Sequence, residues 1–320
     1  MAVIGSIGAG KSAIVKMLLS RGLADGHAAV VLDPKNEYGA LARSHNGERV
    51  SLGDGGWWNP FRDNESENLN FLVALIGTAR GQNISDVQRA VIEECWLSSS
   101  AAKAARPLER LWRWCEHGHD ELAATLRRFV VGDLAGLVDG SGPPLAPNSS
   151  LLVLDMSSWW LSESLAVAAL VAWQMASVRL AHYEGLGYLV VDEAWALLQN
   201  EFATTWLQGA WKLARAHGVA NIAVVHRLHD AQAAGDANSA NRSRALGLLK
   251  DCSTYVLFQH AEGDLESLRE TIGLTTTEER YVVALPRGTA LVRYGASRSV
   301  VRLTPTKHDF TFIDTDGAMQ

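Results

Sequence analysis

The chain has 320 residues, 48% of them hydrophobic and 20% charged, which is an ordinary globular balance and enough for one large α/β domain with an insertion. A formal net charge of -6 argues against a protein that coats nucleic acid with its whole surface, although a local basic stripe stays compatible with it. The three cysteines match no metal or redox spacing, so they indicate a reduced, cytoplasmic protein. The longest apolar stretch, residues 164–178, is shorter than the ~20 residues that a membrane span needs and predicts a core element.

The first motif in the chain is a phosphate loop, Gly5-Ser6-Ile7-Gly8-Ala9-Gly10-Lys11-Ser12, which fits the pattern G-x-x-x-x-G-K-[ST]. Its glycines let consecutive backbone N–H groups face a phosphate, and the helix that follows adds the positive end of its dipole. We expect Lys11 to reach the β- and γ-phosphates and Ser12 to ligate magnesium. The predicted cofactors are ATP and Mg²⁺, bound by Gly5, Ser6, Ile7, Gly8, Ala9, Gly10, Lys11, Ser12 and Ala13.

Only four residues, Met1 to Ile4, precede this loop, whereas a phosphate loop normally follows a full buried strand. Either the first strand is short or the chain begins inside a longer ancestral protein, and we favour the second interpretation. The missing part would then be an N-terminal domain.

Five further apolar runs predict strands buried on both faces, and the runs alternate with helical segments. The predicted strands are residues 28–32, 151–154, 188–191, 221–225 and 254–259, and the predicted crossover helices are residues 11–19, 164–179 and 202–216. The first four runs end next to Asp33, Asp155, Asp192 and His226. This pattern is typical of an α/β fold with a mostly parallel central sheet and a functional site along its carboxyl edge.

Two regions depart from this alternation. Residues 61–140 predict a helical insertion between the second and third strands, with a capping box at Ser85 to Gln88, a helix opening at Pro107, and a third helix carrying Leu122, Leu126 and Phe129. Residues 290–303 predict an antiparallel hairpin at a sheet edge, and residues 310–320 predict a loose polar tail. Residues 1–60 and 141–320 would together form the nucleotide-binding domain.

The second half of the site is Asp192-Glu193, which follows the apolar run Leu189-Val190-Val191. We expect Asp192 to hold magnesium through its water shell and Glu193 to polarise the attacking water. An acidic first turn of a helix is the alternative interpretation. The adjacent glutamate favours hydrolysis over phosphoryl transfer to a small molecule, because a kinase must exclude water.

Further candidates are a histidine and three arginines. His226 ends the next strand and could donate to the γ-phosphate or the lytic water, although capping of a strand end is an alternative. Arg215 is a candidate arginine finger for a neighbouring subunit, with Arg242 and Arg244 as rivals, and a solvated surface arginine is the alternative for Arg215.

Two other segments stay open at this stage. The turn Asp33-Pro34-Lys35-Asn36-Glu37-Tyr38 would place its carboxylates on the edge that carries the phosphate loop, or be a solvated turn. The tandem tryptophans Trp57-Trp58 and Trp159-Trp160 fit core or subunit contacts better than stacking platforms for nucleic acid.

Taken in order, these motifs resemble the ATPase domain of the VirB/Tra-type conjugation and type IV secretion ATPases, within the HerA/FtsK superfamily. The resemblance covers nearly the whole chain, and it rests on the phosphate loop, Asp33 to Tyr38, Asn59-Pro60-Phe61, Gly132-Asp133-Leu134-Ala135-Gly136-Leu137-Val138-Asp139-Gly140, Asp192-Glu193-Ala194-Trp195, residues 268–274 and Leu285-Pro286-Arg287-Gly288.

The resemblance implies a RecA-like P-loop ATPase that forms a ring, a hexamer, at the cytoplasmic base of a secretion channel on the inner face of the cell membrane. Its implied partners are further copies of itself and channel components, with DNA left open. Lys11 and Ser12 would bind nucleotide, Asp192 and Glu193 would handle magnesium and water, and Arg215 matches the arginine before the family's sensor strand. His226 stands where the family has glutamine, and the family's N-terminal docking domain has no counterpart here.

Three functions therefore compete. The first is ATP hydrolysis that powers conjugative or type IV secretion transfer. The second is a HerA/FtsK-type pump acting on duplex DNA, and the third is a nucleotide-binding assembly component with little turnover.

Overall fold

The structure, a computed structural model, describes residues 1–53, 60–61, 65–138, 149–160, 162–181, 183, 185–198, 204, 208, 211, 218–226 and 240–313. Within these residues nine strands form one sheet in the order β3-β4-β2-β5-β6-β1-β7-β8-β9. The strands are β1 (Ala2–Ile4), β2 (Ala28–Asp33), β3 (Glu48–Ser51), β4 (Leu151–Asp155), β5 (Gly187–Val191), β6 (Val219–Val225), β7 (Thr254–Leu257), β8 (Thr289–Tyr294) and β9 (Ser297–Arg302).

The sheet is parallel from β3 to β7, and the last two strands add antiparallel pairs at one edge. All five predicted apolar runs are strands, and the predicted hairpin is formed by β8 and β9. The sequence analysis missed β3, whose residues are only partly buried and include Glu48 and Arg49. An edge strand of this kind has no apolar run, so its register against β4 comes from tertiary pairing.

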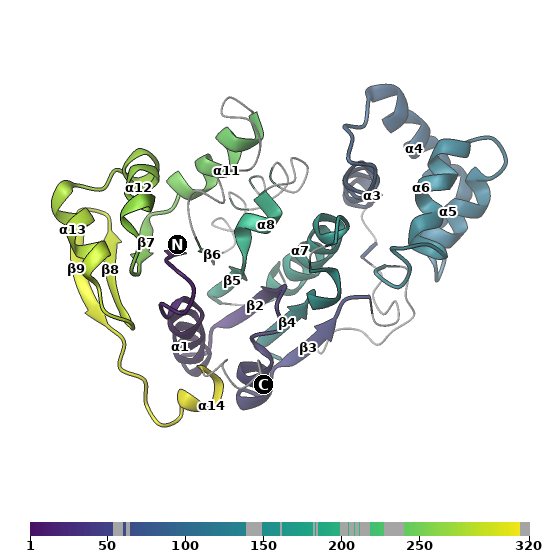
Figure 1. Ribbon diagram of the computed structural model, residues 1–320. Helices are drawn as coiled ribbons and strands as arrows, with labels where there is room; N and C mark the ends of the chain where they lie inside the picture. Colours follow the sequence, from purple (N-terminus) through teal and green to yellow (C-terminus); the bar gives the residue numbers. More distant parts are fainter. Residues whose placement is uncertain are drawn as a thin grey trace.

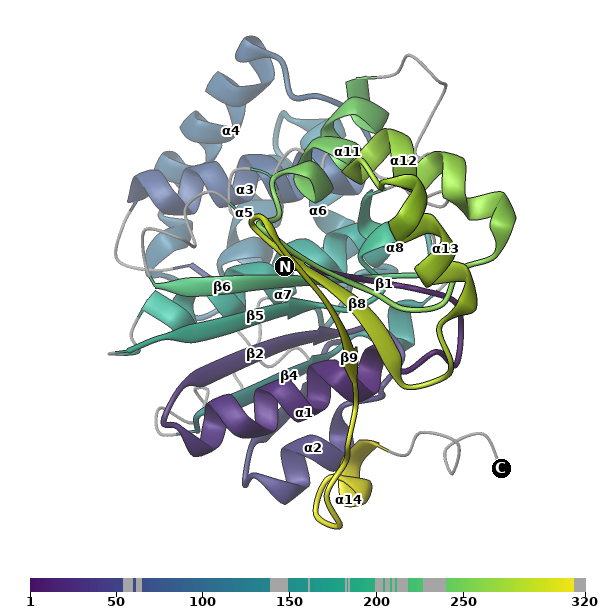
Figure 2. The same ribbon diagram turned by 90° about the vertical axis from the view of Figure 1, so that its left-hand side faces the viewer.

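Helices cover both faces of the sheet, as Figure 2 shows. One face carries α1 (Lys11–Ala24), α2 (Gly39–Ser44) and α14 (Phe310–Ile313), which share a core with alternate strand residues such as Val31 and Val190. The other face carries α7 (Leu165–Ala181) and α8 (Ala194–Leu198), packed on Leu32 and Val191 among others. The two-sided burial explains why the central strands are apolar along their whole length.

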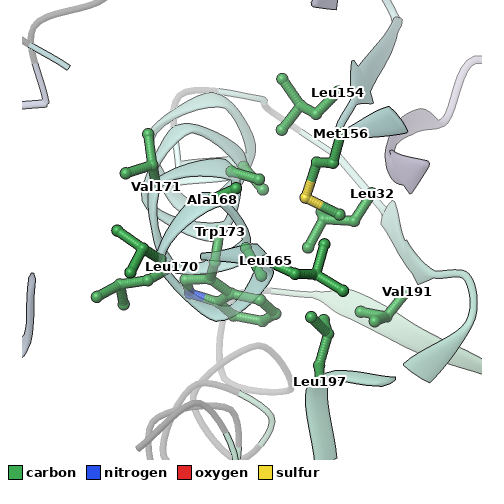
Figure 3. Packing of buried hydrophobic residues seen from close by; sticks show 14 of the residues in the cluster. Leu32, Leu154, Met156, Leu165, Ala168, Leu170, Val171, Trp173, Val191 and Leu197 are labelled. Carbon is green, nitrogen blue, oxygen red and sulfur yellow. The ribbon is translucent and has the colours of Figure 1, made fainter. Parts of the chain in front are cut away.

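The helix α7 is the main support beneath the carboxyl ends of the central strands (Figure 3). Its buried side chains, among them Leu165, Ala168 and Trp173, lie against Leu154 of β4 and Val191 of β5. The apolar stretch at residues 164–178 is thus a core helix, as predicted. Among the helices of the described residues, none combines the length and apolar character that crossing a membrane requires.

The helical insertion stands to one side of the sheet in Figure 1 and contains α3 (Glu65–Arg80), α4 (Asp86–Ser99), the short η1 (Ala101–Lys103), α5 (Pro107–Cys115) and α6 (Asp120–Val130). The predicted capping box is present, because Ser85 Oγ accepts from Gln88 N and Gln88 Oε1 accepts from Ser85 N. Pro107 opens α5 as predicted. The insertion follows β3, the strand missed in the sequence, and α3 was not predicted.

The C-terminal part contains α11 (Ala240–Lys250), η3 (Glu262–Asp264), α12 (Leu265–Ile272), α13 (Thr276–Ala284) and the edge hairpin. After β9 the chain crosses to α14, where Phe312 is buried and Arg21 of α1 forms a bidentate ion pair with Asp309. The prediction of a loose tail from residue 310 is therefore wrong for residues 310–313, because tertiary contacts order them. Most of the predicted helix at 202–216 lies outside the described residues, although Thr204, Gln208 and Trp211 are helical.

The packing beneath the carboxyl edge gives a first prediction. Leu154 of β4 is fully buried on the face of the sheet that α7 covers, so Leu154→Ala should lower the free energy of unfolding by about 2–5 kcal/mol. The half-exposed Val300 on the edge strand is the control, and Val300→Ala should change stability by less than about 0.5 kcal/mol. Urea titrations of both variants measure the difference, and equal losses would contradict the placement of the core.

Candidate nucleotide-hydrolysis site

The phosphate loop joins the end of β1 to the first turn of α1. Gly8 and Gly10 have φ angles of 75° and 114°, a region that strains any other side chain. Lys11 is 5% exposed, and its ammonium donates to the carbonyl oxygens of Gly5 (2.7 Å) and Ser6 (2.9 Å). Burial lowers the pKa of Lys11 to about 8, although Glu193 and Asp192 oppose the shift. The ammonium thus lies folded over the loop, on backbone oxygens that phosphate oxygens would replace.

Two segments that are distant in sequence pack against the phosphate loop. Phe258, directly after β7, packs so closely that a Cβ atom at Gly5 would lie 2.6 Å from the Phe258 Cβ. Gly288, before β8, donates its N–H to the carbonyl oxygen of Ala9 at 3.3 Å. In the sequence, the segment Leu285-Pro286-Arg287-Gly288 stood out only through its family resemblance. In the structure, its Gly288 contacts the phosphate loop.

Asp192 ends β5 and is buried, with one backbone hydrogen bond from Glu193 N to its Oδ1 at 2.8 Å. Burial raises the pKa of Asp192 to about 7, and the nearby Glu37, Glu193 and Asp33 add to the shift. The carboxylate is therefore buried next to other acidic side chains, and the nearby Lys11 does not offset burial and repulsion. A divalent cation would supply further positive charge.

Glu193 is buried and has a φ angle of 50°, a backbone strain typical of functional sites. Its Oε1 lies 2.5 Å from both Lys35 Nζ and His226 Nε2, and its Oε2 accepts from Trp195 Nε1 at 2.5 Å. Burial by itself raises the pKa of Glu193, but the hydrogen bonds from His226, Lys35 and Trp195 outweigh it and lower the pKa to about 2. The residue stays ionised throughout the physiological range.

The strand order explains how His226 reaches Glu193. The strand β6 lies between β1 and β5, so its carboxyl end separates the phosphate loop from the acidic pair. His226 follows directly after β6, and its Nδ1 is buried without a hydrogen-bond partner among the described residues. The histidine thus contacts Glu193 through Nε2, and its Nδ1 could form a further hydrogen bond with a ligand or a water molecule.

The turn after β2 lies on the same edge, as predicted, and its residues have distinct roles. Asp33 accepts from the backbone N–H groups of Glu37 (3.0 Å) and Tyr38 (2.9 Å), although burial still raises its pKa to about 6. Lys35 extends to Glu193 and also lies 5.1 Å from the ring centroid of Trp160. Neither contact was expected from sequence. The Lys35 ion pair joins distant segments, and the hydrogen bond from Trp195 depends on side-chain geometry that no local pattern indicates.

The remaining candidates are only partly settled. Trp159 is buried and donates to the carbonyl oxygen of Leu52 at 2.8 Å, so it is a core residue. Trp160 packs edge-on against Trp195, with ring centroids 6.0 Å apart, next to the site. Arg244 lies on α11, whereas Arg215, the Arg242 side chain and Trp57-Trp58 lie outside the described residues, and their roles stay predictions.

The residues present fit a magnesium nucleotide. The glycine cradle has the backbone conformation that a phosphate needs, and α1 begins at the loop with its N–H groups facing it. Ser12 and Asp192 offer hard oxygen ligands of the kind that Mg²⁺ prefers. Burial raises the pKa of Asp192, and His226 Nδ1 has no hydrogen-bond partner in the part of the chain that the structure describes, so a bound ion or water would satisfy both groups.

The fold and the phosphate loop define this chain as one with a RecA-like P-loop fold, with the expected α/β class, mostly parallel sheet and antiparallel edge strands. Residues 1–121 match the family model described as the central domain of helicase HerA. No match is found among curated protein sequences.

Solved structures show the same fold over nearly the whole chain. VirB4 of Thermoanaerobacter pseudethanolicus is similar with a TM-score of 0.79 and 21% identity, over 97% of this chain and 90% of that chain. The unbound bacterial conjugative coupling protein TrwB gives a TM-score of 0.66 and 16% identity, over 96% and 85%. TrwB in complex with ADP and Mg²⁺ gives 0.65 and 16%, with the same coverage. The chain therefore shares its fold with VirB4 and TrwB, as the resemblance implied.

The buried carboxylate of Asp192 gives a prediction on pH. Its folded-state pKa of about 7 lies above the unfolded value of about 3.9, so the ionised form destabilises the metal-free fold above pH 7, and the penalty vanishes towards pH 4. Asp192→Asn keeps an oxygen for Glu193 N and removes the charge. We expect the variant to be more stable than the wild type at pH 8 and to converge with it near pH 4.

Thermal unfolding in EDTA without nucleotide, at pH 4, 6 and 8, measures this difference. The exposed Asp251→Asn serves as the control and should follow the wild type. A stability difference that is constant across this pH range would contradict the assignment.

Proposed function

We propose that this chain binds ATP with Mg²⁺ at its phosphate loop and hydrolyses it to ADP and phosphate, as a ring-forming motor for conjugative or type IV secretion transfer. One observation carries the proposal. The ends of the adjacent strands β1, β6 and β5 bring together the phosphate loop, His226 and the pair Asp192-Glu193. A phosphate cradle, a buried unneutralised carboxylate and an ionised glutamate next to each other suit hydrolysis.

Each side chain has a role that follows from its position. The loop N–H groups and Lys11 bind the phosphates, and Ser12 and Asp192 hold the magnesium ion, which neutralises charge that develops on the phosphate oxygens. Glu193 orients a water molecule and accepts its proton. His226 donates to the carboxylate through Nε2 and can accept a hydrogen bond from the water through Nδ1.

The comparisons with solved structures support ATP as the ligand and conjugative transfer as the process. TrwB, a bacterial conjugative coupling protein, was solved with ADP and Mg²⁺ and with a non-hydrolysable ATP analogue. By that likeness the partners of this chain are further copies of itself, in a hexamer, and channel components at the cytoplasmic face of the cell membrane. Arg215 is the proposed arginine finger across the subunit boundary, with Arg242 and Arg244 as alternatives.

A second candidate function has its own support. The family model that matches residues 1–121 describes a helicase domain, which favours a motor that translocates on duplex DNA. Addition of duplex DNA to an ATPase assay separates the two candidates. A DNA pump should hydrolyse ATP several-fold faster with duplex DNA, whereas a motor that works on channel components should not respond.

Lys11→Ala tests the site itself. The change removes the cation of the phosphate loop, so we expect ATP hydrolysis to fall by at least about 10²-fold. Lys103→Ala, an exposed lysine of the insertion, is the matched control and should keep the wild-type rate. Normal hydrolysis by folded Lys11→Ala protein would exclude this site.

Glu193→Gln separates binding from hydrolysis. The amide keeps the shape of the side chain but loses basicity, so hydrolysis should fall by about 10²- to 10⁴-fold while ADP affinity is kept. Isothermal titration with ADP and a phosphate-release assay measure the two effects. Slow turnover in the wild type and the variant alike, with tight binding in both, would favour the nucleotide-binding assembly component instead.

A further inference from the structure

The carboxylate of Glu193 is occupied by donors in this structure. Its Oε1 accepts from both Lys35 and His226, and its Oε2 accepts from Trp195. A carboxylate oxygen has two lone pairs, so Oε1 is filled and Oε2 has one position left. A carboxylate in this state is a poor acceptor for the proton of an attacking water, because its charge is already shared among three donors.

Of the three donors, Lys35 is the one free to leave. Trp195 lies two residues after Glu193 and packs edge-on against Trp160, and His226 is fixed to the end of the buried strand β6. Lys35 instead belongs to an exposed turn next to Asn36, which has a φ angle of 57°. Its side chain is 34% exposed and has a flexible four-carbon stem.

A bound phosphate would be a second partner for Lys35 within the same site. The ammonium groups of Lys11 and Lys35 are close enough that Lys35 contributes to the lowered pKa of Lys11. Lys11 belongs to the phosphate loop and marks the phosphate position. A triphosphate bound there would add a strongly charged γ-phosphate within the field of both cations, and a diphosphate lacks that group.

We propose that Lys35 locks Glu193 in the nucleotide-free site and transfers to the γ-phosphate of bound ATP, which releases Glu193 to activate water. The proposal rests on the proposed function, because it concerns the same site. It makes Lys35 a residue that distinguishes ATP from ADP, and it makes the unlocking of the catalytic carboxylate a consequence of substrate binding.

The experiment measures binding rather than turnover. In wild-type protein, ATP must compete with Glu193 for Lys35, whereas in Glu193→Gln the ammonium is available without that competition. Affinities for a non-hydrolysable ATP analogue and for ADP, each with Mg²⁺, are measured by calorimetry in the wild type, Glu193→Gln, Lys35→Met and the double variant. We expect Glu193→Gln to bind the ATP analogue about tenfold more tightly than the wild type does, with ADP affinity unchanged.

The double variant decides the assignment. The gain from Glu193→Gln should vanish in Lys35→Met/Glu193→Gln and persist in Lys35→Arg/Glu193→Gln, which keeps a cation at this position. Lys103→Met in the Glu193→Gln background is the control and should leave the gain intact. Thermal unfolding of each variant checks that all of them fold.

Three results would overturn the proposal: no gain in Glu193→Gln, a gain that survives Lys35→Met, or equal changes for the ATP analogue and ADP. The last result would assign Lys35 a merely structural role in the turn. These outcomes differ from a failure of the proposed function, in which folded wild-type protein binds neither nucleotide.

Discussion

The burial of acidic side chains at the carboxyl edge of the sheet is the constraint on which the site depends. Asp33 and Asp155 end the strands β2 and β4, Asp192 follows β5 directly, and α7 packs beneath the same strand ends. A buried carboxylate is costly unless it is paired or hydrogen-bonded. Asp33 receives two backbone N–H groups, and Asp155 receives Arg49, Ser51 and the N–H of Ser157. Asp192 receives the N–H of Glu193, and burial raises its pKa further than that of Asp33, to about 7. Of these three carboxyl groups, the one with the most strongly raised pKa is thus the one assigned to magnesium.

The phosphate loop is held in place by parts of the chain that are distant in sequence. Phe258 and Gly288 press on the loop from β7 and the approach to β8. At the other end of α1, the ion pair between Arg21 and Asp309 ties the helix to the segment that leads into α14. The C-terminal hairpin and its continuation therefore do more than cover a sheet edge, because they fix the helix whose first residue is Lys11.

Local patterns predicted much of this structure, and tertiary pairing decided the rest. The phosphate loop, the apolar strands, the capping box at Ser85 and the edge hairpin each depend on a few neighbouring residues, so their sequence signals are complete. The edge strand β3 and the helix α14 form only because β4, α1 and α2 lie next to them. The same distinction holds for the site. Asp192 and Glu193 were predictable from their position after a strand, but Lys35 and Trp195 contact Glu193 through side-chain geometry that only the fold fixes.

The strand order also limits what the site can do. Because β6 separates β1 from β5, Glu193 stands one strand away from the loop and His226 fills the interval between them. The proposed hydrolysis needs a water molecule between the glutamate and the terminal phosphate, so a glutamate one strand away from the loop suits it better than one in the loop itself. A neutral histidine offers one donor and one acceptor, on its two ring nitrogens. With Nε2–H donating to Glu193, Nδ1 is left as an acceptor for the O–H of a water molecule, so His226 can link the end of β6, the carboxylate and the water.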